Sequence, residues 1–350
     1  MQLRLAEIRS RVGGWRPSLT DARPALTARA RTASRGRRPA AGWRIVAAKE
    51  LADDLRSVRF LILLVLLGLA GVAAILSAAG AIRDAAGEAA QHPSPFLLLY
   101  TTSPEQIPSL VALIGFLGPL LGIAFGFDAV NNERAQGTLP RLVAQPIHRD
   151  DIINGKFAAG LAAIALTFTV LVAVLAGVGI VRLGITPGPE DVARLLVYLI
   201  VTIAYVGLWL GFALLCSVVL ARAATSALVA MATWLVLTVF GTLLLGLLAD
   251  LFTGDASTPR EALSDYQLTR MLSWLSPQTL YAEATTVLLN PEARVLGVVL
   301  PEQVDRAVPG TLSLGQSLLV VWPQLTALVA GCVVVFAVAY VRFLRQEVRA

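Results

Sequence analysis

Residues 108–181 read PSLVALIGFLGPLLGIAFGFDAVNNERAQGTLPRLVAQPIHRDDIINGKFAAGLAAIALTFTVLVAVLAGVGIV, two apolar runs separated by one polar stretch. Each run, 108–127 and 157–181, is long enough as a helix to cross a hydrocarbon layer of about 30 Å. Four further runs of this kind occur, at 60–82, 195–220, 227–249 and 318–341. The sequence therefore predicts an all-α membrane protein with six transmembrane helices in one transmembrane domain, residues 60–345.

The composition supports this class. The chain has 350 residues, of which 56% are hydrophobic and 15% are charged, and its mean hydropathy is +0.72. A soluble domain of this size buries a full core at far lower hydrophobicity. The net charge of +6 would suggest nucleic acid as a partner of a soluble protein. Basic residues flank membrane spans for topological reasons, so no nucleic-acid partner is expected here.

Positive charge is distributed unevenly between the connections. Of the 29 Lys and Arg residues, 22 lie in alternate connections that include both ends of the chain. These connections are 1–59, 128–156, 221–226 and 342–350. Since cytoplasmic connections carry the excess of Lys and Arg, both termini are predicted to be cytoplasmic.

The first segment, residues 1–41, is rich in Arg, Ala, Pro and Ser, and only Glu7 and Asp21 are acidic. This composition predicts a disordered basic N-terminal arm that lies against an anionic membrane face. An Arg-rich, acid-poor start is also typical of an organelle transit peptide.

Residues 42–59 have apolar side chains at helical steps of three and four, with Trp43 among them and Lys49 and Arg56 on the other side. The pattern predicts an interfacial connecting helix before the first span, anchored by Trp43. The amphipathy is imperfect because Glu50 and Asp54 fall on the apolar arc. A plain helical extension of the first span is the alternative.

Two spans carry glycines at steps of four: Gly118, Gly122 and Gly126 in the second, and Gly207 and Gly211 in the fourth. Small residues at this spacing let helix backbones approach closely in lipid. They predict a tight packing seam, within the subunit or at a dimer interface. Glycine is also common in membrane helices without such a role.

The longest outer connection, 250–317, contains helix-like stretches at 263–275 and 278–289, on either side of Ser276-Pro277. An ordered extracytoplasmic cap is therefore expected rather than a bare loop.

The spans hold essentially no charged residues between their ends. Their polar or amphipathic members include Tyr198, Trp209, Cys216 and Gln324, and no charged partner is expected for them. A proton- or sodium-coupled transporter needs titratable or ion-coordinating groups near the midplane. This pattern therefore argues against such a transporter and against an intramembrane hydrolase.

No catalytic, cofactor-binding or metal-ligating residue can be assigned. Cys216 and Cys332 both lie in apolar runs, and His92 and His148 are far apart. Lys156 follows a glycine but lacks the upstream glycine of a phosphate-binding loop, so no nucleotide is expected to bind this chain by that route. Any energy for transport must come from another subunit.

The polar stretch 128–156 has internal order, with an acidic-basic pair, a Gly-Thr turn, a short apolar helix and a charged run. Thr138 can act as an N-cap, Pro140 fits in a first helical turn, and Pro146 ends the segment. We interpret it as a structured knob that docks on a soluble partner. A solvated loop without a partner is the alternative.

This stretch resembles the cytoplasmic loop of ABC-2-type transporter permeases of the nitrous-oxide-accessory and drug-export branch. The matching features are Glu133, Gly137-Thr138-Leu139, Pro146, Arg149 and Gly155-Lys156. The segment Ala48–Leu51 with Arg56 resembles the family's connecting helix, and Ser276-Pro277 through Tyr281 resembles a segment before its last span. The likeness covers residues 43 to about 345.

The resemblance implies that 128–156 contains a cytoplasmic coupling helix that sits in a cleft of an ATPase subunit. Glu133 and Arg134 would then make charge contacts, and Thr138 would keep the helix rigid. The full set of implied coupling-loop residues is Glu133, Arg134, Gly137, Thr138, Leu139, Arg141, Arg149 and Lys156.

The resemblance further implies a permease subunit in the plasma (inner) membrane of a prokaryote, with two copies of a cytoplasmic ABC ATPase subunit as partners. ATP and Mg would bind to that partner and not to this chain. A second permease copy or a paralogue would complete the complex, and export would proceed by alternating access. The alternative is a membrane scaffold or assembly factor that binds a partner through 128–156 and transports nothing. Apolar spans would suit a hydrophobic cargo.

Overall fold

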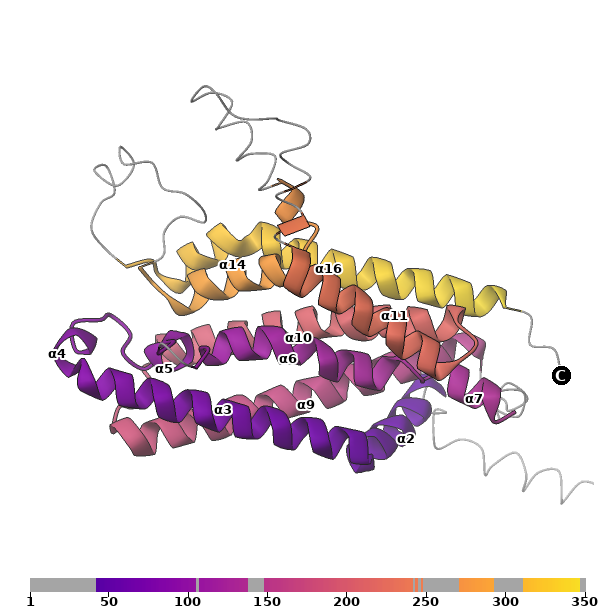
Figure 1. Cartoon of the computed structure of the whole chain (residues 1–350), viewed down its shortest axis with the longest axis horizontal. Helices are drawn as coiled ribbons and strands as arrows, with labels where there is room; N and C mark the ends of the chain where they lie inside the picture. Colours follow the sequence, from indigo (N-terminus) through magenta and orange to yellow (C-terminus); the bar gives the residue numbers. More distant parts are fainter. Residues whose placement is uncertain are drawn as a thin grey trace, which may run out of the picture. The chain divides into compact units, whose positions relative to one another are not determined.

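The computed structural model describes residues 42–104, 107–137, 148–241, 243–244, 247, 271–292 and 311–346. In these residues the chain is helical and contains no strand, and six helices are long and apolar enough to cross a membrane. These helices are α3 (Val58–Asp84), α6 (Leu110–Gly126), α9 (Arg149–Leu183), α10 (Pro189–Val219), α11 (Ala223–Leu235) with its π-helical continuation η1 (Val236–Phe240), and α16 (Leu314–Arg345) (Figure 1). The predicted fold class, all-α with six spans, is confirmed.

Some expectations concern other parts of the chain. The predicted basic arm, 1–41, lies outside the described residues, as do 138–147, where the coupling helix was expected, and most of 263–275.

The boundaries of the long helices also differ from those expected. The third long helix, α9, begins eight residues before the apolar run. Asp150 and Asp151 in its first turn interact favourably with the positive end of the helix dipole.

Shorter helices lie at the two ends of the bundle. We call one end the α7 end, after the helix α7 (Asn131–Ala135) that lies there (Figure 1). The same end contains α2 (Gly42–Arg56), the turn between α10 and α11, and the last turn of α16. The opposite end, the α4 end, contains α4 (Ala86–Ala89) and α5 (Leu98–Thr101). The described parts of the connections predicted to share the Lys/Arg-rich side thus lie at one end.

Helix α10 is the most enclosed of the six, and it packs against α6, α9 and α16. Its contact with α6 depends on glycine. A Cβ atom on Gly122 would lie 2.6 Å from the carbonyl oxygen of Val206, and one on Gly126 would lie 2.7 Å from that of Leu210. The two backbones are therefore in direct contact along this seam.

The glycines of α10 do not face those of α6. A Cβ atom on Gly207 would meet Leu161 of α9 at 3.0 Å, and one on Gly211 would meet Phe157 of α9 and Val335 of α16, each at 3.7 Å. The contacts found for all five glycines thus lie within one subunit. A role for any of them between subunits stays a prediction.

Replacing Gly122 with alanine is expected to destabilise the protein by about 1–3 kcal/mol, because the new methyl group displaces backbone and not a flexible side chain. The matched control is Gly68→Ala, where a Cβ atom has no neighbour within 4 Å. Thermal unfolding in detergent should show a lower midpoint for G122A only. Equal midpoints for the two variants would contradict the close contact of α6 with α10.

The helix α14 (Pro277–Leu289) belongs to the core of the bundle, where it packs against α6, α10 and α16. It begins sharply because Ser276 accepts a hydrogen bond from Thr279 N and Pro277 occupies the first helical position. This helix corresponds to the expected stretch 278–289. Its apolar face, which includes Tyr281, is buried.

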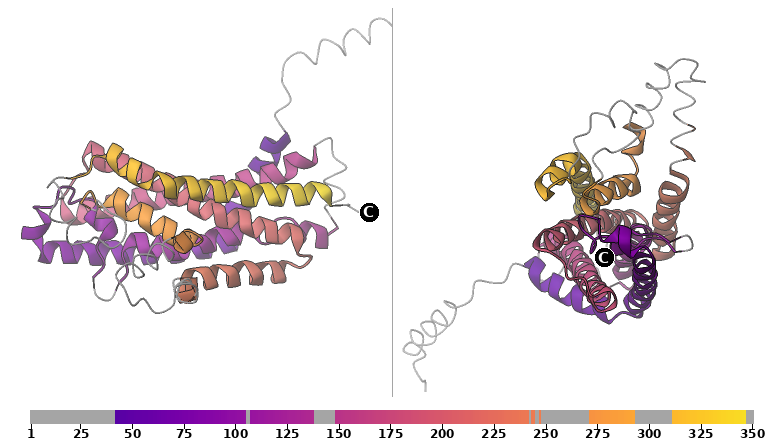
Figure 2. Two further views of the ribbon diagram at one scale, coloured as in Figure 1. Left: turned by 90° about the horizontal axis from the view of Figure 1, so that it is seen from above. Right: turned by 90° about the vertical axis from the view of Figure 1, so that its left-hand side faces the viewer.

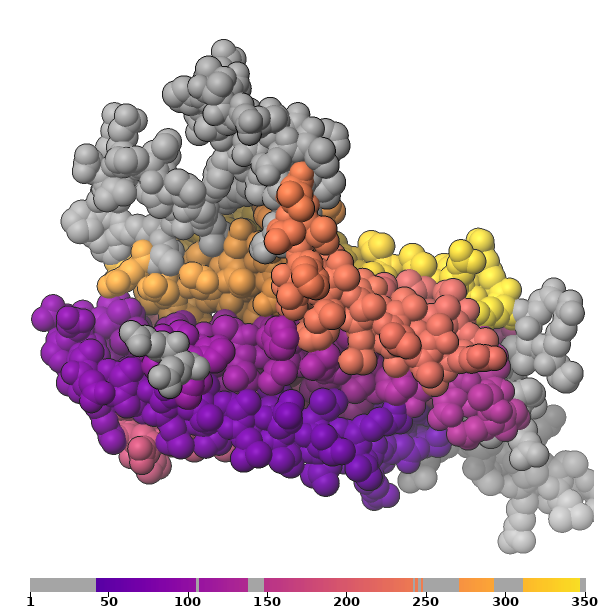
Figure 3. Space-filling model, in the orientation of Figure 1, coloured from indigo at the N-terminus to yellow at the C-terminus, as the bar shows by residue number. Residues whose placement is uncertain are grey.

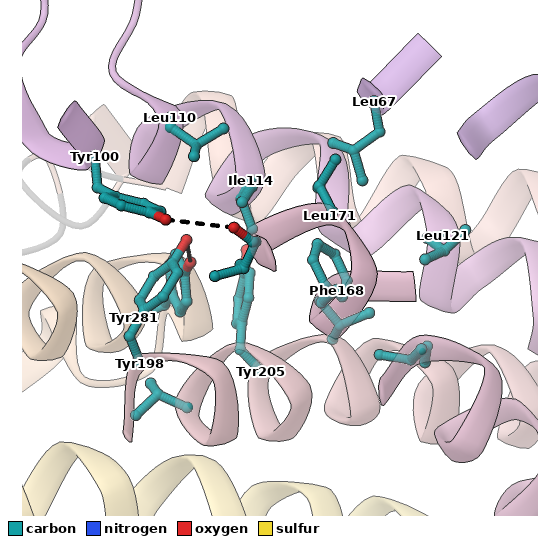
Figure 4. Packing of buried hydrophobic residues seen from close by; sticks show 14 of the residues in the cluster. Leu67, Tyr100, Leu110, Ile114, Leu121, Phe168, Leu171, Tyr198, Tyr205 and Tyr281 are labelled. Atoms are coloured by element: carbon teal, nitrogen blue, oxygen red, sulfur yellow. Dashed lines mark hydrogen bonds between the residues drawn. The ribbon is translucent and has the colours of Figure 1, made fainter. Parts of the chain in front are cut away.

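Tyrosines from α10 and α14 form a buried polar network near the α4 end (Figure 4). The Tyr205 hydroxyl donates to the carbonyl of Gly115 at 2.9 Å, and the Tyr281 hydroxyl donates to Tyr198 Oη at 3.2 Å. The rings of Tyr205 and Tyr281 stack with their centroids 4.5 Å apart. The network satisfies hydroxyls that would be costly to bury alone.

One expectation about the spans was wrong. Gln324 of α16 does have a charged partner, since its Nε2 donates to Glu283 Oε2 of α14 at 2.9 Å. Glu283 lies outside the apolar runs, so a search of the runs alone could not find this pair.

Helix α11 and η1 lie at the periphery of the bundle, and only 17% of their most apolar window is buried. The space-filling view shows this segment as a surface band across the bundle (Figure 3), and the end-on view shows the long helices running side by side (Figure 2). Leu228 is 70% exposed. In a bilayer this surface faces lipid or another subunit.

Candidate functional site at the α7 end

Lys156 joins three segments that are far apart in the sequence. Its ammonium group lies 2.7 Å from Glu133 Oε1, at α7, and 3.1 Å from Glu50 Oε2, on α2, while Lys156 itself is on α9. The Lys156 side chain is only 5% exposed, and the two carboxylates are 16% and 20% exposed. Ion pairs screened from water to this degree interact more strongly than pairs on an open surface.

A close backbone contact brings α2 to Lys156. The neighbouring Gly155 faces α2, and a Cβ atom there would lie 2.6 Å from Val46 Cβ and 2.9 Å from the carbonyl oxygen of Trp43. Asp151, one turn earlier on α9, accepts from the backbone nitrogen of Trp43 at 3.1 Å. This bond satisfies an otherwise unpaired amide at the start of α2.

The ion pairs explain the imperfect amphipathy of α2. Glu50, which falls on its apolar arc, faces Lys156 and not lipid. Lys49 and Arg56 are exposed, as is Trp43, whose exposed fraction is 37%. The placement of α2 at a membrane interface stays a prediction.

A second ion pair connects the start of α3 with the end of α6. Arg59 Nη1 donates to Asp128 Oδ2 at 2.7 Å, and its guanidinium lies 5.2 Å from the ring centroid of Phe127. Both pairs border an open cleft of about 220 Å³. The charged residues that line the cleft are Lys49, Glu50, Asp53, Asp54, Arg59, Asp128, Glu133 and Lys156. Five of them are acidic and three are basic, so the cleft carries an excess of negative charge.

Asp54 is the residue in this cleft whose pKa is shifted furthest from its ordinary value. The pKa of its carboxyl is raised from 3.8 to about 7, chiefly by burial. The charges of Glu50 and Asp128 also raise this pKa, and those of Lys156 and Arg59 lower it. A carboxyl of this kind changes its protonation near neutral pH.

Asp54→Asn is expected to make stability less dependent on pH. Because the folded pKa lies above the unfolded value of 3.8, the native state binds the proton more tightly, and stability falls as pH rises from about 4 to 7. An asparagine carries no such charge, so D54N should have the higher unfolding midpoint at pH 8, and the difference should shrink towards pH 5. The control is Asp53→Asn, because the Asp53 side chain is 64% exposed. A D54N midpoint at or below that of the wild type at pH 8 would contradict the raised pKa.

Gln346, directly after the end of α16, makes three hydrogen bonds at the α7 end. Its Oε1 accepts from Arg134 Nη2 at 2.5 Å, its backbone carbonyl accepts from Arg149 Nη1 at 3.2 Å, and its Nε2 donates to the carbonyl of Val218 at 2.7 Å. The two arginines flank residues 138–147 in the sequence. Through these hydrogen bonds of Gln346, the last turns of α10 and α16 are connected to the residues on both sides of 138–147.

Of the eight residues implied for a coupling loop, five are in the described part of the chain. Glu133 and Lys156 contact each other, and Arg134 and Arg149 share Gln346. Gly137 has a φ of 65°, which favours glycine, and it ends the turn that follows α7. Thr138, Leu139 and Arg141 lie outside the described residues.

Arg194, in the first turns of α10 near the α4 end, was not singled out in the sequence. Its side chain is fully buried. It pairs with Glu190 at 2.9 Å, and it donates to the carbonyls of Leu288 and Leu312 and to Ser317 Oγ. Glu190 four residues earlier, on the same face of α10, was the available signal.

Comparisons with known proteins agree with this architecture. The sequence model of a family described as "ABC-2 family transporter protein" matches residues 44–348. The chain is 37% identical over 86 residues to a protein of Stutzerimonas stutzeri named "Probable ABC transporter permease protein NosY", which is 25% of this chain and 29% of that one. It is 31% identical over 112 residues to the protein of the same name in Pseudomonas aeruginosa, which is 32% of this chain and 36% of that one.

The chain thus spans about a third of the length of these curated relatives, whereas the family match covers most of the chain itself. Together with six helices that can span a membrane, this match settles the family. The chain belongs to the ABC-2 family of transporter proteins.

Proposed function

We propose that this chain is the membrane subunit of an ABC exporter, and that a cytoplasmic ATPase subunit docks at the α7 end through residues 138–147. ATP and Mg bind to that ATPase, two copies of which serve two membrane subunits. Both termini of this chain lie in the cytoplasm, and the membrane is the inner membrane of a prokaryote. The excess of Lys and Arg in the connections of the α7 end supports this orientation.

The observation that carries the proposal is the joining of α2, α7 and α9 by Lys156. A displacement of 138–147 by the ATPase would act on α7 and α9, which flank the segment. Through Lys156 and Glu50 it would also move α2, and α3 follows α2 directly in the chain. The loop can therefore move the first three spans together, as alternating access requires.

The test is purification of the tagged full chain from its own membranes in mild detergent, with identification of bound proteins and an ATPase assay. We expect a nucleotide-binding ATPase in stoichiometric amount. Glu133→Arg places two cations together at the loop, so transport or the stimulation of ATP hydrolysis should fall by at least about ten-fold.

The matched control is Glu88→Arg, the same change at an exposed site on α4, which should keep both activities. Both variants must insert into the membrane and elute as a single species. Full activity of E133R would contradict the coupling role. Recovery of the chain without any nucleotide-binding partner would favour a membrane scaffold that transports nothing.

A further inference from the structure

A groove of about 410 Å³ lies between the last turns of α10 and α16 at the α7 end. It is lined by Val219, Val341, Arg342, Arg345 and Gln346. Neither arginine makes an ion pair or a hydrogen bond with another side chain in the described part of the chain. Two cations for which the described residues provide no counter-charge thus stand beside Val219 and Val341, which are 55% and 42% exposed.

The groove lies where two helices that are long and apolar enough to cross a membrane end, so in a bilayer it would lie near the lipid headgroups. The end of a helix carries partial negative charge, which would repel an anion. Here the carbonyl of Val218 already accepts a hydrogen bond from Gln346 Nε2 at 2.7 Å. Among the described residues that line the groove, Arg342 and Arg345 are the charged ones.

We propose that this groove binds one anionic phospholipid, with its phosphate on Arg342 and Arg345 and an acyl chain along Val219 and Val341. Guanidinium groups bind phosphate oxygens in pairs of hydrogen bonds, and basic pockets between membrane helices bind anionic headgroups. A soluble phosphate would use the arginines but would leave the valines uncovered. The apolar wall is the reason for assigning a lipid.

The leaflet is the one at the α7 end, which is the cytoplasmic leaflet in the topology proposed above. The lipid would also lie next to the loop. Gln346, which lines the groove, is the residue that binds Arg134 and Arg149 on either side of 138–147. An occupied groove would hold Gln346 in place and so support the loop.

The test is native mass spectrometry of the full chain in detergent, with phosphatidylglycerol and phosphatidylcholine of the same acyl chains added in equal amounts. We expect one retained phosphatidylglycerol per chain. Each basic residue near an anionic lipid contributes about five-fold in affinity, so R342Q/R345Q should bind it about twenty- to thirty-fold more weakly. Lipid retention is measured without the ATPase, so the result does not depend on the proposed transport function.

Two further variants distinguish lipid binding at this groove from a general effect of the net charge of the chain. R44Q/R182Q removes the same two charges from exposed positions outside the groove and should retain the lipid. R342K/R345K keeps both positive charges and should also retain the lipid. This result would show that the site tolerates substitution. The proposal is overturned if R342Q/R345Q binds phosphatidylglycerol as the wild type does, or if R44Q/R182Q loses it equally. It is also overturned if glycerophosphoglycerol, the soluble headgroup without acyl chains, binds as tightly as the lipid.

Discussion

Replacement of Lys156 by methionine is expected to lower the free energy of unfolding by about 3–5 kcal/mol, because it leaves two carboxylates facing each other in a poorly hydrated site. Glu50 and Glu133 both lose their buried cation, Glu50 keeps only the exposed Lys49, and neither carboxylate side chain is more than 20% exposed. Methionine fills a volume similar to that of lysine, so the change removes charge and not packing. Thermal unfolding in detergent should show a midpoint lower by about 10 °C.

The chain provides a matched control for this substitution. Its only other lysine, Lys49, also pairs with two carboxylates, Glu50 at 3.1 Å and Asp53 at 3.4 Å, but its side chain is 65% exposed. Surface pairs of this kind contribute about 0–1 kcal/mol, so K49M should leave the midpoint nearly unchanged.

A second variant tests whether the lost stability comes from the carboxylates. In K156M/E133Q one of the two carboxylates that faced Lys156 is no longer charged, and part of the lost stability should return. Equal midpoints for K156M and K49M would show that Lys156 is not the joint between α2, α7 and α9.

The class of the fold could be predicted because membrane spanning is a local property. A run such as 157–181 needs no knowledge of its neighbours to be identified as a helix that crosses a bilayer. The excess of Lys and Arg in a connection can likewise be read from the sequence alone. The described parts of the connections grouped by it lie together at the α7 end. Helix α14 was also visible in advance, since Ser276-Pro277 marks a helix start.

The site could be predicted only in part. Glu133 and Lys156 were assigned to one loop, and they contact each other, but the assignment came from a resemblance and not from the spacing. Glu50 was assigned to the connecting helix by the same resemblance, and in the pattern of 42–59 it appeared as a flaw in the amphipathy. Its partner lies 106 positions away, and no periodicity within one helix contains such a pairing. The roles of Thr138, Leu139 and Arg141 stay predictions.

Arg194 shows the same limit at the α4 end of the bundle. In the sequence it is one of two basic residues in a short outer connection, where an arginine normally faces water. In the structure α10 begins at Pro189, six residues before the apolar run 195–220, and this extra length of helix carries Arg194 into the core. Apart from Glu190, its hydrogen-bond partners lie 94 to 123 positions later in the chain.

Replacing Arg194 with leucine is therefore expected to destabilise the protein by about 3–5 kcal/mol, mainly through the hydrogen-bond acceptors that it leaves without a donor, each of which costs about 1–3 kcal/mol. The ion pair itself contributes less, because the Glu190 side chain is 57% exposed. The substitution leaves the carbonyls of Leu288 and Leu312 without their donor. It also frees Glu190, whose Oε1 accepts from the first backbone amide of α16, Leu314 N, at 3.1 Å. The end of α14 and the start of α16 should separate from α10, and the unfolding midpoint in detergent should fall by about 10 °C.

Arg182→Leu is the matched control, because Arg182 lies in the same outer connection with an exposed side chain, and its midpoint should stay close to that of the wild type. Arg194→Lys should give an intermediate value. A lysine keeps the charge opposite Glu190, but its single ammonium group cannot also reach two carbonyls and Ser317 in the fixed fork of a guanidinium. If R194L and R182L unfold at the same temperature, Arg194 does not hold α10, α14 and α16 together. If R194K is as unstable as R194L, the hydrogen bonds to the carbonyls contribute more than the ion pair.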